Sequence, residues 1–141
     1  SCGLWRVRLG VEQGLQMVGD KDPEALRSVV EAWVQDADPL VKRAAVAAIC
    51  EPRLLRSPES AVVAVSVCAA ATRALPDMPI ASKKSPGVRA LRQALGYCWS
   101  VAVAADPEPG FAAFRALDAS DPDVAWIVRE NRKKKRLARL E

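Results

Sequence analysis

The side chains with ligating or nucleophilic chemistry are few in this chain. Its 141 residues include no histidine and four cysteines, which are Cys2, Cys50, Cys68 and Cys98. A zinc site needs Cys or His ligands at short, clustered spacings, and these cysteines are 48, 18 and 30 residues apart. We therefore predict no metal and no other cofactor. Cysteines in Ala- and Val-rich stretches are expected to be buried free thiols of a protein in a reducing cytoplasm.

The absence of histidine also restricts catalysis. The imidazole ring is the most frequent general acid or base because its pKa lies near neutrality. Carboxylate or lysine chemistry stays possible in principle, but no spacing of such residues calls for it. We predict that the chain is not an enzyme.

Basic residues recur at matched places in three segments that begin at Pro39, Pro86 and Pro122. At about 100° per residue from the valine shortly after each proline, five basic side chains fall in one sector. They are Lys42, Arg89, Arg129, Arg132 and Arg136. Such a stripe would attract an acidic partner, either nucleic-acid phosphates or an acidic peptide. The alternative is that these residues bind groups of neighbouring helices, and that the basic run over residues 132–136 is a solvated terminal face.

Trp126 falls in the same sector as Arg129 and Lys133. An exposed tryptophan beside cations can stack on a base or anchor a protein interface. Packing against a neighbouring helix is the simpler interpretation. The candidate binding residues are thus Lys42, Arg89, Trp126, Arg129, Arg132, Lys133 and Arg136.

Six Asp-Pro or Ser-Pro dipeptides each precede a helical pattern. Asp or Ser accepts hydrogen bonds from free amides at a helix start, and Pro at the first helical position lacks an amide that would have no partner. The predicted starts are Pro23, Pro39, Pro58, Pro86, Pro107 and Pro122. Apolar residues at three- and four-residue spacing predict a further helix over residues 4–18. The sequence therefore predicts an all-α protein of about seven helices.

The helix starts alternate between the first and second members of a pair. Second helices recur with periods of 47 and 36 residues, which is typical of stacked helical arrays. The middle pair is longer, because Pro58 and Pro86 are 28 residues apart, against 16 and 15 in the others. The excess lies in residues 75–85, where Pro76 and Pro79 interrupt any helix, so we expect a protruding loop.

Two second helices carry a recognisable pattern. Residues 38–49 and 121–131 resemble the HEAT-repeat signature, in which Asp-Pro precedes a valine and a run of small apolar residues. The resemblance implies a right-handed α-α superhelix, forming a single HEAT-like domain over residues 1–141. It also implies that the second helices line a concave wall. Because the chain starts without Met and its first predicted helix is the second member of an earlier pair, we expect a C-terminal fragment of a longer array.

HEAT arrays serve as scaffolds, adaptors, transport factors and, occasionally, nucleic-acid-binding proteins, so the resemblance indicates a fold more than a function. Our first hypothesis is a scaffold or adaptor that binds a protein partner. The alternative is nucleic-acid binding through a basic concave face, although the net charge of +4 is modest. The third is a HEAT-like DNA glycosylase, for which no residue here matches the acidic and aromatic groups required.

The sequence predicts no contact with a membrane. The longest weakly polar run, residues 61–72, is about half the ~20 residues that a membrane span needs. We expect a cytoplasmic protein, and the sequence leaves its oligomeric state open.

Overall fold

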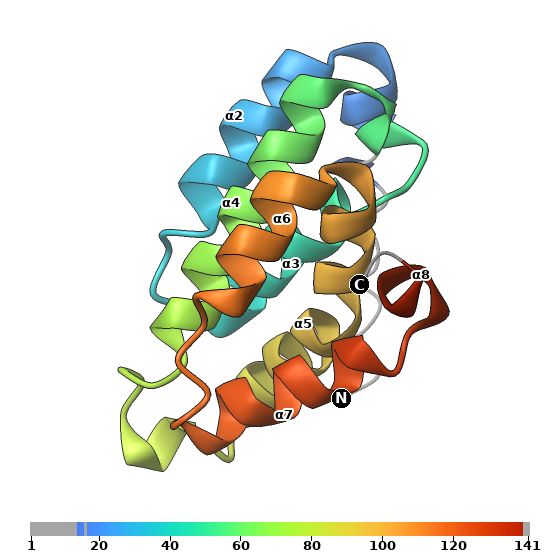
Figure 1. The fold of residues 1–141 in the computed structure, drawn as a ribbon. Helices are drawn as coiled ribbons and strands as arrows, with labels where there is room; N and C mark the ends of the chain where they lie inside the picture. The colour runs from blue at the N-terminus through green and yellow to red at the C-terminus, as the bar shows by residue number, and fades with distance from the viewer. Residues whose placement is uncertain (1–13, 16, 140–141) are drawn as a thin grey trace.

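The computed structural model describes residues 14–15 and 17–139, and this part of the chain is helical without strands (Figure 1). The main helices are α2 (Pro23–Trp33), α3 (Pro39–Ile49), α4 (Pro58–Ala74), α5 (Pro86–Ala105), α6 (Pro107–Arg115) and α7 (Pro122–Arg132). Shorter turns are η1 (Leu54–Arg56), η2 (Ile80–Ser82) and α8 (Lys135–Ala138). All six predicted helix starts and the all-α class are confirmed. The further helix predicted over residues 4–18 lies mostly outside the described residues.

The residue before the proline caps the helix, as expected, in five of the six described helices that begin with proline. Asp38 Oδ1 accepts a hydrogen bond from the Leu40 amide at 2.9 Å, and Asp121 Oδ2 accepts one from the Val124 amide at 3.1 Å. Similar capping bonds are made by Asp22, Ser57 and Ser85. Asp106, which ends α5 and begins α6 with no loop between them, makes no such bond.

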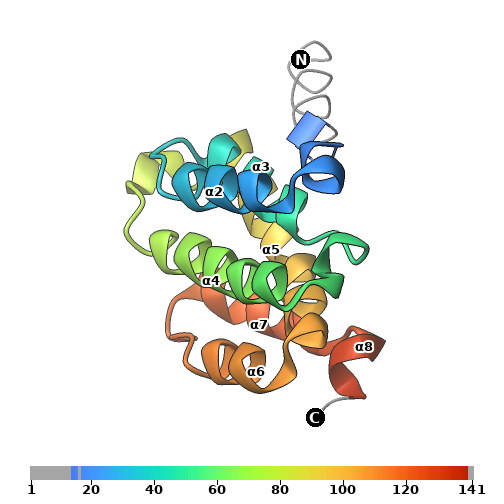
Figure 2. The same cartoon turned by 90° about the horizontal axis from the view of Figure 1, so that it is seen from above.

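The helices form two layers (Figure 2). The first members of the pairs, α2, α4 and α6, contact one another in one layer, while α3, α5 and α7 form the other. Helix α5 lies at the centre, in contact with α3 and α7 beside it and with α4 and α6 across the layers. A helix in this position must bury several faces, and α5 does so from Cys98 to Val103, where every residue is buried.

The interior is built mainly from small side chains, as a sequence with only 5% aromatic residues requires. Trp99 is the largest wholly buried residue; its ring lies 5.6 Å from that of Phe114. Its indole Nε1 donates to Thr72 Oγ1 at 2.9 Å, and that hydroxyl donates to the Cys68 carbonyl at 2.7 Å. Trp99 is therefore a packing residue of the core. None of the described helices is both long and apolar enough to cross a membrane.

The loop predicted over residues 75–85 joins α4 to α5. It contains η2, and its Ile80 side chain is 87% exposed. Pro76 and Pro79 fall where α4 has ended, which agrees with their role as helix breakers.

A buried amide joins α7 to α5. Asn131 is wholly buried; its Nδ2 donates to the Leu95 carbonyl at 2.9 Å and its Oδ1 accepts from the Ser100 amide at 3.0 Å. The Leu95 carbonyl and the Ser100 amide are five residues apart, whereas the ordinary α-helical bond joins groups four residues apart. The two groups therefore do not bond to each other, and Asn131 binds both. A side chain inserted in this way bends a helix, and Figure 1 shows α5 changing direction along its length.

Candidate functional site

Lys42 lies inside the protein. Its side chain is only 7% exposed, and Nζ donates to the Val34 carbonyl at the end of α2 at 2.8 Å. Burial lowers the pKa of the Lys42 ammonium, while the nearby Asp36 carboxylate opposes that effect. A cation at this place satisfies a helix carbonyl and complements the negative end of the α2 dipole. Lys42 is therefore engaged within the helix pair rather than displayed to a ligand.

Trp126 packs on α5. A Cβ added at Gly96 would lie 2.8 Å from the Trp126 ring, so glycine is what lets the indole approach the helix backbone. The Arg92 guanidinium covers the ring, with Cζ 3.9 Å from the centroid, and Arg92 Nε lies 3.0 Å from Asp123 Oδ1. The structure thus places Trp126 in the contact between α5 and α7, half-buried beneath an arginine.

The C-terminal basic run does not continue α7. The predicted basic stripe requires one continuous helix through Arg136. Instead, α7 ends at Arg132 and the chain turns before α8. The turn buries Leu137 completely, since α8 packs on α5. Arg136 is therefore not in line with Arg129, and that part of the predicted stripe is wrong.

The remaining predicted cations differ in their surroundings. Lys133 Nζ binds Glu130 Oε2 at 2.7 Å, and this hydrogen bond lowers the pKa of the Glu130 carboxyl. Arg89, Arg129 and Arg132 are exposed on the second helices. The structure thus displays only part of the predicted basic surface, and several of its members bind within the protein.

Arg136 instead joins a cluster around Tyr97. Its Nη2 lies 3.3 Å from the Tyr97 hydroxyl, its Cζ lies 5.2 Å from the ring centroid, and Lys134 Nζ lies 5.5 Å from the same centroid. Tyr97 is 44% exposed. A phenol ring between two cations was not singled out by the sequence, because Tyr97 falls on α5 and the cations fall on a turn that breaks the helical pattern.

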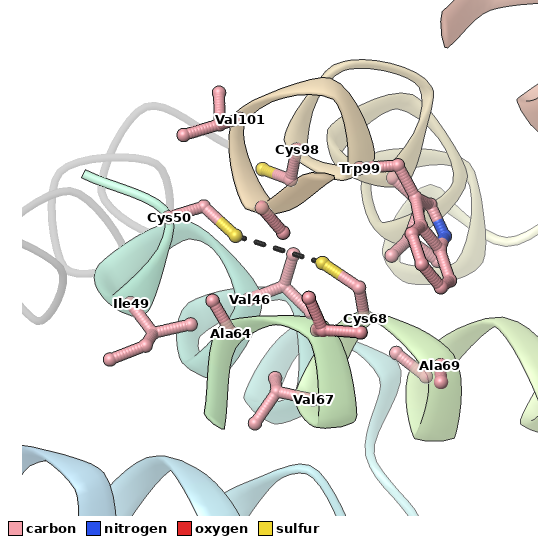
Figure 3. Packing of buried hydrophobic residues seen from close by; sticks show 14 of the residues in the cluster. Val46, Ile49, Cys50, Ala64, Val67, Cys68, Ala69, Cys98, Trp99 and Val101 are labelled. Carbon is pink, nitrogen blue, oxygen red and sulfur yellow. Dashed lines mark hydrogen bonds between the residues drawn. The ribbon is translucent and has the colours of Figure 1, made fainter. Parts of the chain in front are cut away.

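Three of the four cysteines meet in the core (Figure 3). Cys50 Sγ, at the end of α3, lies 3.6 Å from Cys68 Sγ on α4, and Cys98 of α5 is beside them. All three are buried free thiols, as predicted; Cys2 lies outside the described residues. Hydrogen bonding between the thiols and burial raise the pKa of Cys50 and of Cys98 well above the ordinary value. Raised pKa values keep thiols protonated and unreactive, so the cluster serves packing.

No group of three or more Cys, Asp or Glu side chains within residues 14–15 and 17–139 is arranged to hold a metal ion.

A surface pocket of about 420 Å³ lies where η1, the end of α5 and α8 meet. Its apolar lining comes from Pro52, Leu55, Val101, Ala104 and Ala105. Two guanidinium groups, those of Arg56 and Arg136, complete the lining. We call this the η1–α8 pocket. Helical periodicity does not indicate this pocket, because the pocket depends on how the chain turns after α7.

Comparisons with known proteins leave the chain without an assigned relative: no family model matches it, and neither the curated proteins nor the solved structures contain a match.

Proposed function

We propose that this chain is a HEAT-like helical array, wound as a right-handed α-α superhelix, that binds a protein partner and acts as a scaffold or adaptor. Support for the array comes from the regular helix starts, the alternation of first and second helices, and their separation into two layers. In such arrays each pair contributes a strip of surface, and the strips together form a long binding face.

The observation that carries the choice of a protein partner is the η1–α8 pocket. Five of its seven lining residues are apolar. Protein interfaces are built around desolvated apolar pockets that receive anchor side chains, whereas duplex binding depends on cations that face phosphates.

The basic side chains support this choice, because several are used within the protein. Lys42 binds a backbone carbonyl, Lys133 pairs with Glu130, and Arg92 pairs with Asp123. A cation that is engaged in this way would bind a phosphate less strongly, because the internal contact would have to be broken or shared. Binding of nucleic acid, the alternative function, would depend chiefly on the exposed Arg89, Arg129 and Arg132.

The two functions differ in their response to salt and nuclease. If three arginines contacted phosphates, a rise in salt from about 50 to about 200 mM would weaken duplex binding about 40-fold. This follows from a fall in the logarithm of the affinity of about 0.9 per contact for each tenfold rise in salt. We expect the chain to capture a protein from an extract of its source, in near-stoichiometric amount, with capture that survives nuclease and about 200 mM salt. Capture of nucleic acid alone, lost on nuclease treatment and with a steep salt dependence, would overturn the proposal.

A further inference from the structure

We propose that the η1–α8 pocket receives an acidic peptide segment of the partner, in which a bulky apolar side chain lies next to one or more carboxylates. The inference rests on the proposed protein-binding function and adds to it the chemistry of the bound segment.

The floor of the pocket determines the first part of this chemistry. Leu55 and Val101 are buried at the base, while Pro52 and Ala104 are exposed at the rim. A volume of about 420 Å³ is within the range of sites that hold small ligands or large side chains. Burial of a leucine, phenylalanine or tryptophan side chain there would remove apolar surface of both partners from water.

The two arginines determine the second part. No carboxylate is found among the described residues that line the pocket. Arg56 is exposed and has no hydrogen-bond or ion-pair partner in the part of the chain that the structure describes. Arg136 donates to the Tyr97 hydroxyl, an uncharged partner, so its positive charge is not neutralised there. Guanidinium groups bind carboxylates in a bidentate, planar manner, which favours Asp or Glu in the ligand.

The same lining disfavours nucleic acid in this pocket. None of the seven lining residues carries an aromatic ring on which a base could stack. The two guanidinium groups can bind phosphates as well as carboxylates, so it is the apolar floor that favours a peptide. A hydrophobic floor with a cationic edge instead matches a peptide that carries both an apolar and an acidic side chain.

The experiment selects random peptides of about twelve residues, displayed on phage, against the full chain. We expect enriched peptides that share Leu, Phe or Trp close to Asp or Glu. Their affinity, measured by fluorescence anisotropy, should fall about tenfold or more for the double variant Arg56→Glu/Arg136→Glu. A second selection on that variant should enrich peptides with Lys or Arg in place of the acidic residues.

Ala104→Trp provides an independent variant, because this exposed residue lies in the pocket and a large side chain there should fill it without disturbing the core. It should also weaken peptide binding about tenfold. Arg73→Glu is the matched control: it makes the same charge reversal at an exposed residue in the last turn of α4, away from the pocket, and should leave the affinity unchanged. Thermal unfolding checks that each variant is folded.

Three outcomes would overturn the inference: no enrichment, enriched peptides without acidic residues, or peptides whose affinity ignores both pocket variants. The proposed function is tested separately from the pocket. If a partner protein is captured but neither pocket variant weakens its capture, the pocket assignment fails and the scaffold role stands. If only nucleic acid is captured, the scaffold role itself fails.

Discussion

At the scale of single residues, the contact between α5 and α7 depends on a buried polar group. Asn131 offers both a donor and an acceptor, and it uses them on the Leu95 carbonyl and the Ser100 amide while a third bond returns to the Ile127 carbonyl at 2.7 Å. Buried backbone groups without partners are costly. No apolar side chain of similar size could satisfy the two groups of α5.

We predict that Asn131→Ala lowers the free energy of unfolding by about 2–5 kcal/mol, because two buried backbone groups lose their partner and a cavity opens. Urea denaturation followed by circular dichroism measures the loss. Gln93→Ala, an exposed change on α5, is the control and should alter stability by less than about 0.5 kcal/mol. A loss below about 1 kcal/mol for Asn131→Ala would show that water or rearrangement replaces the amide.

The thiol cluster predicts a dependence on alkaline pH. The folded pKa values of Cys50 and Cys98 are raised above the ordinary 9.0, so the folded state keeps protons that the unfolded chain releases. Their contribution to stability is complete below pH 9.0 and is lost as the pH rises toward the folded values. In that interval, each thiol should lower the free energy of unfolding by about 1.4 kcal/mol for each unit of rise in pH.

The Cys98→Ala variant isolates this effect. Its free energy of unfolding should fall less steeply than that of the unchanged protein from about pH 8 to about pH 10.5, when both are measured by urea denaturation under reducing conditions. Parallel curves over this range would contradict the raised pKa of Cys98.

At the scale of elements, close approach between α5 and α7 depends on Gly96. The Trp126 ring occupies the space that a Cβ would need, as the 2.8 Å separation shows. Glycine in the middle of a helix costs roughly 0.5–1 kcal/mol relative to alanine, and here the cost is offset by the packing of a large aromatic ring.

A double-mutant cycle tests this pairing. Gly96→Ala alone should lower the free energy of unfolding by about 1–3 kcal/mol, because the added methyl group displaces Trp126. In the Trp126→Ala background the same change should instead raise it by about 0.5–1 kcal/mol, the helix preference of alanine over glycine. The two singles and the double are compared by chemical denaturation. Equal effects of Gly96→Ala in both backgrounds would mean that the ring does not limit this position.

The elements themselves were largely predictable from local chemistry. An Asp-Pro or Ser-Pro pair fixes a helix start through the missing amide and, at every pair except Asp106-Pro107, through the cap; neither effect depends on distant residues. The loop over residues 75–85 was predictable for the same reason, since proline breaks a helix locally.

The candidate site was predicted less well, because its contacts are tertiary. Periodicity predicts that Lys42 and Arg89 occupy the same sector of their helices. The ammonium of Lys42 nevertheless binds the end of α2, because that end lies within reach of the side chain. Likewise, the chain turns after α7 and buries Leu137 against α5. This turn places Arg136 beside Tyr97 and not in line with Arg129. A run of basic residues says nothing about this turn, so the η1–α8 pocket was not foreseen.

At the scale of the whole molecule, the two layers give the chain two kinds of surface. The layer of α2, α4 and α6 exposes the acidic first turns of these helices, which contain Glu24, Glu59 and Glu108. The corner formed by η1, α5 and α8 combines an apolar floor with Arg56 and Arg136. A partner that docks at this corner would meet attraction from the arginines and little competition from the protein's own carboxylates.

The most direct test of the protein-binding role is photo-cross-linking at this corner. A benzophenone amino acid replaces the exposed Ala104, and the labelled chain is irradiated in an extract of its source; the control carries the same group at the exposed Val62 of α4. The proposal predicts a discrete adduct with one protein from position 104, absent from position 62 and unaffected by nuclease. Adducts with nucleic acid, or none from position 104 beyond those from position 62, would contradict it.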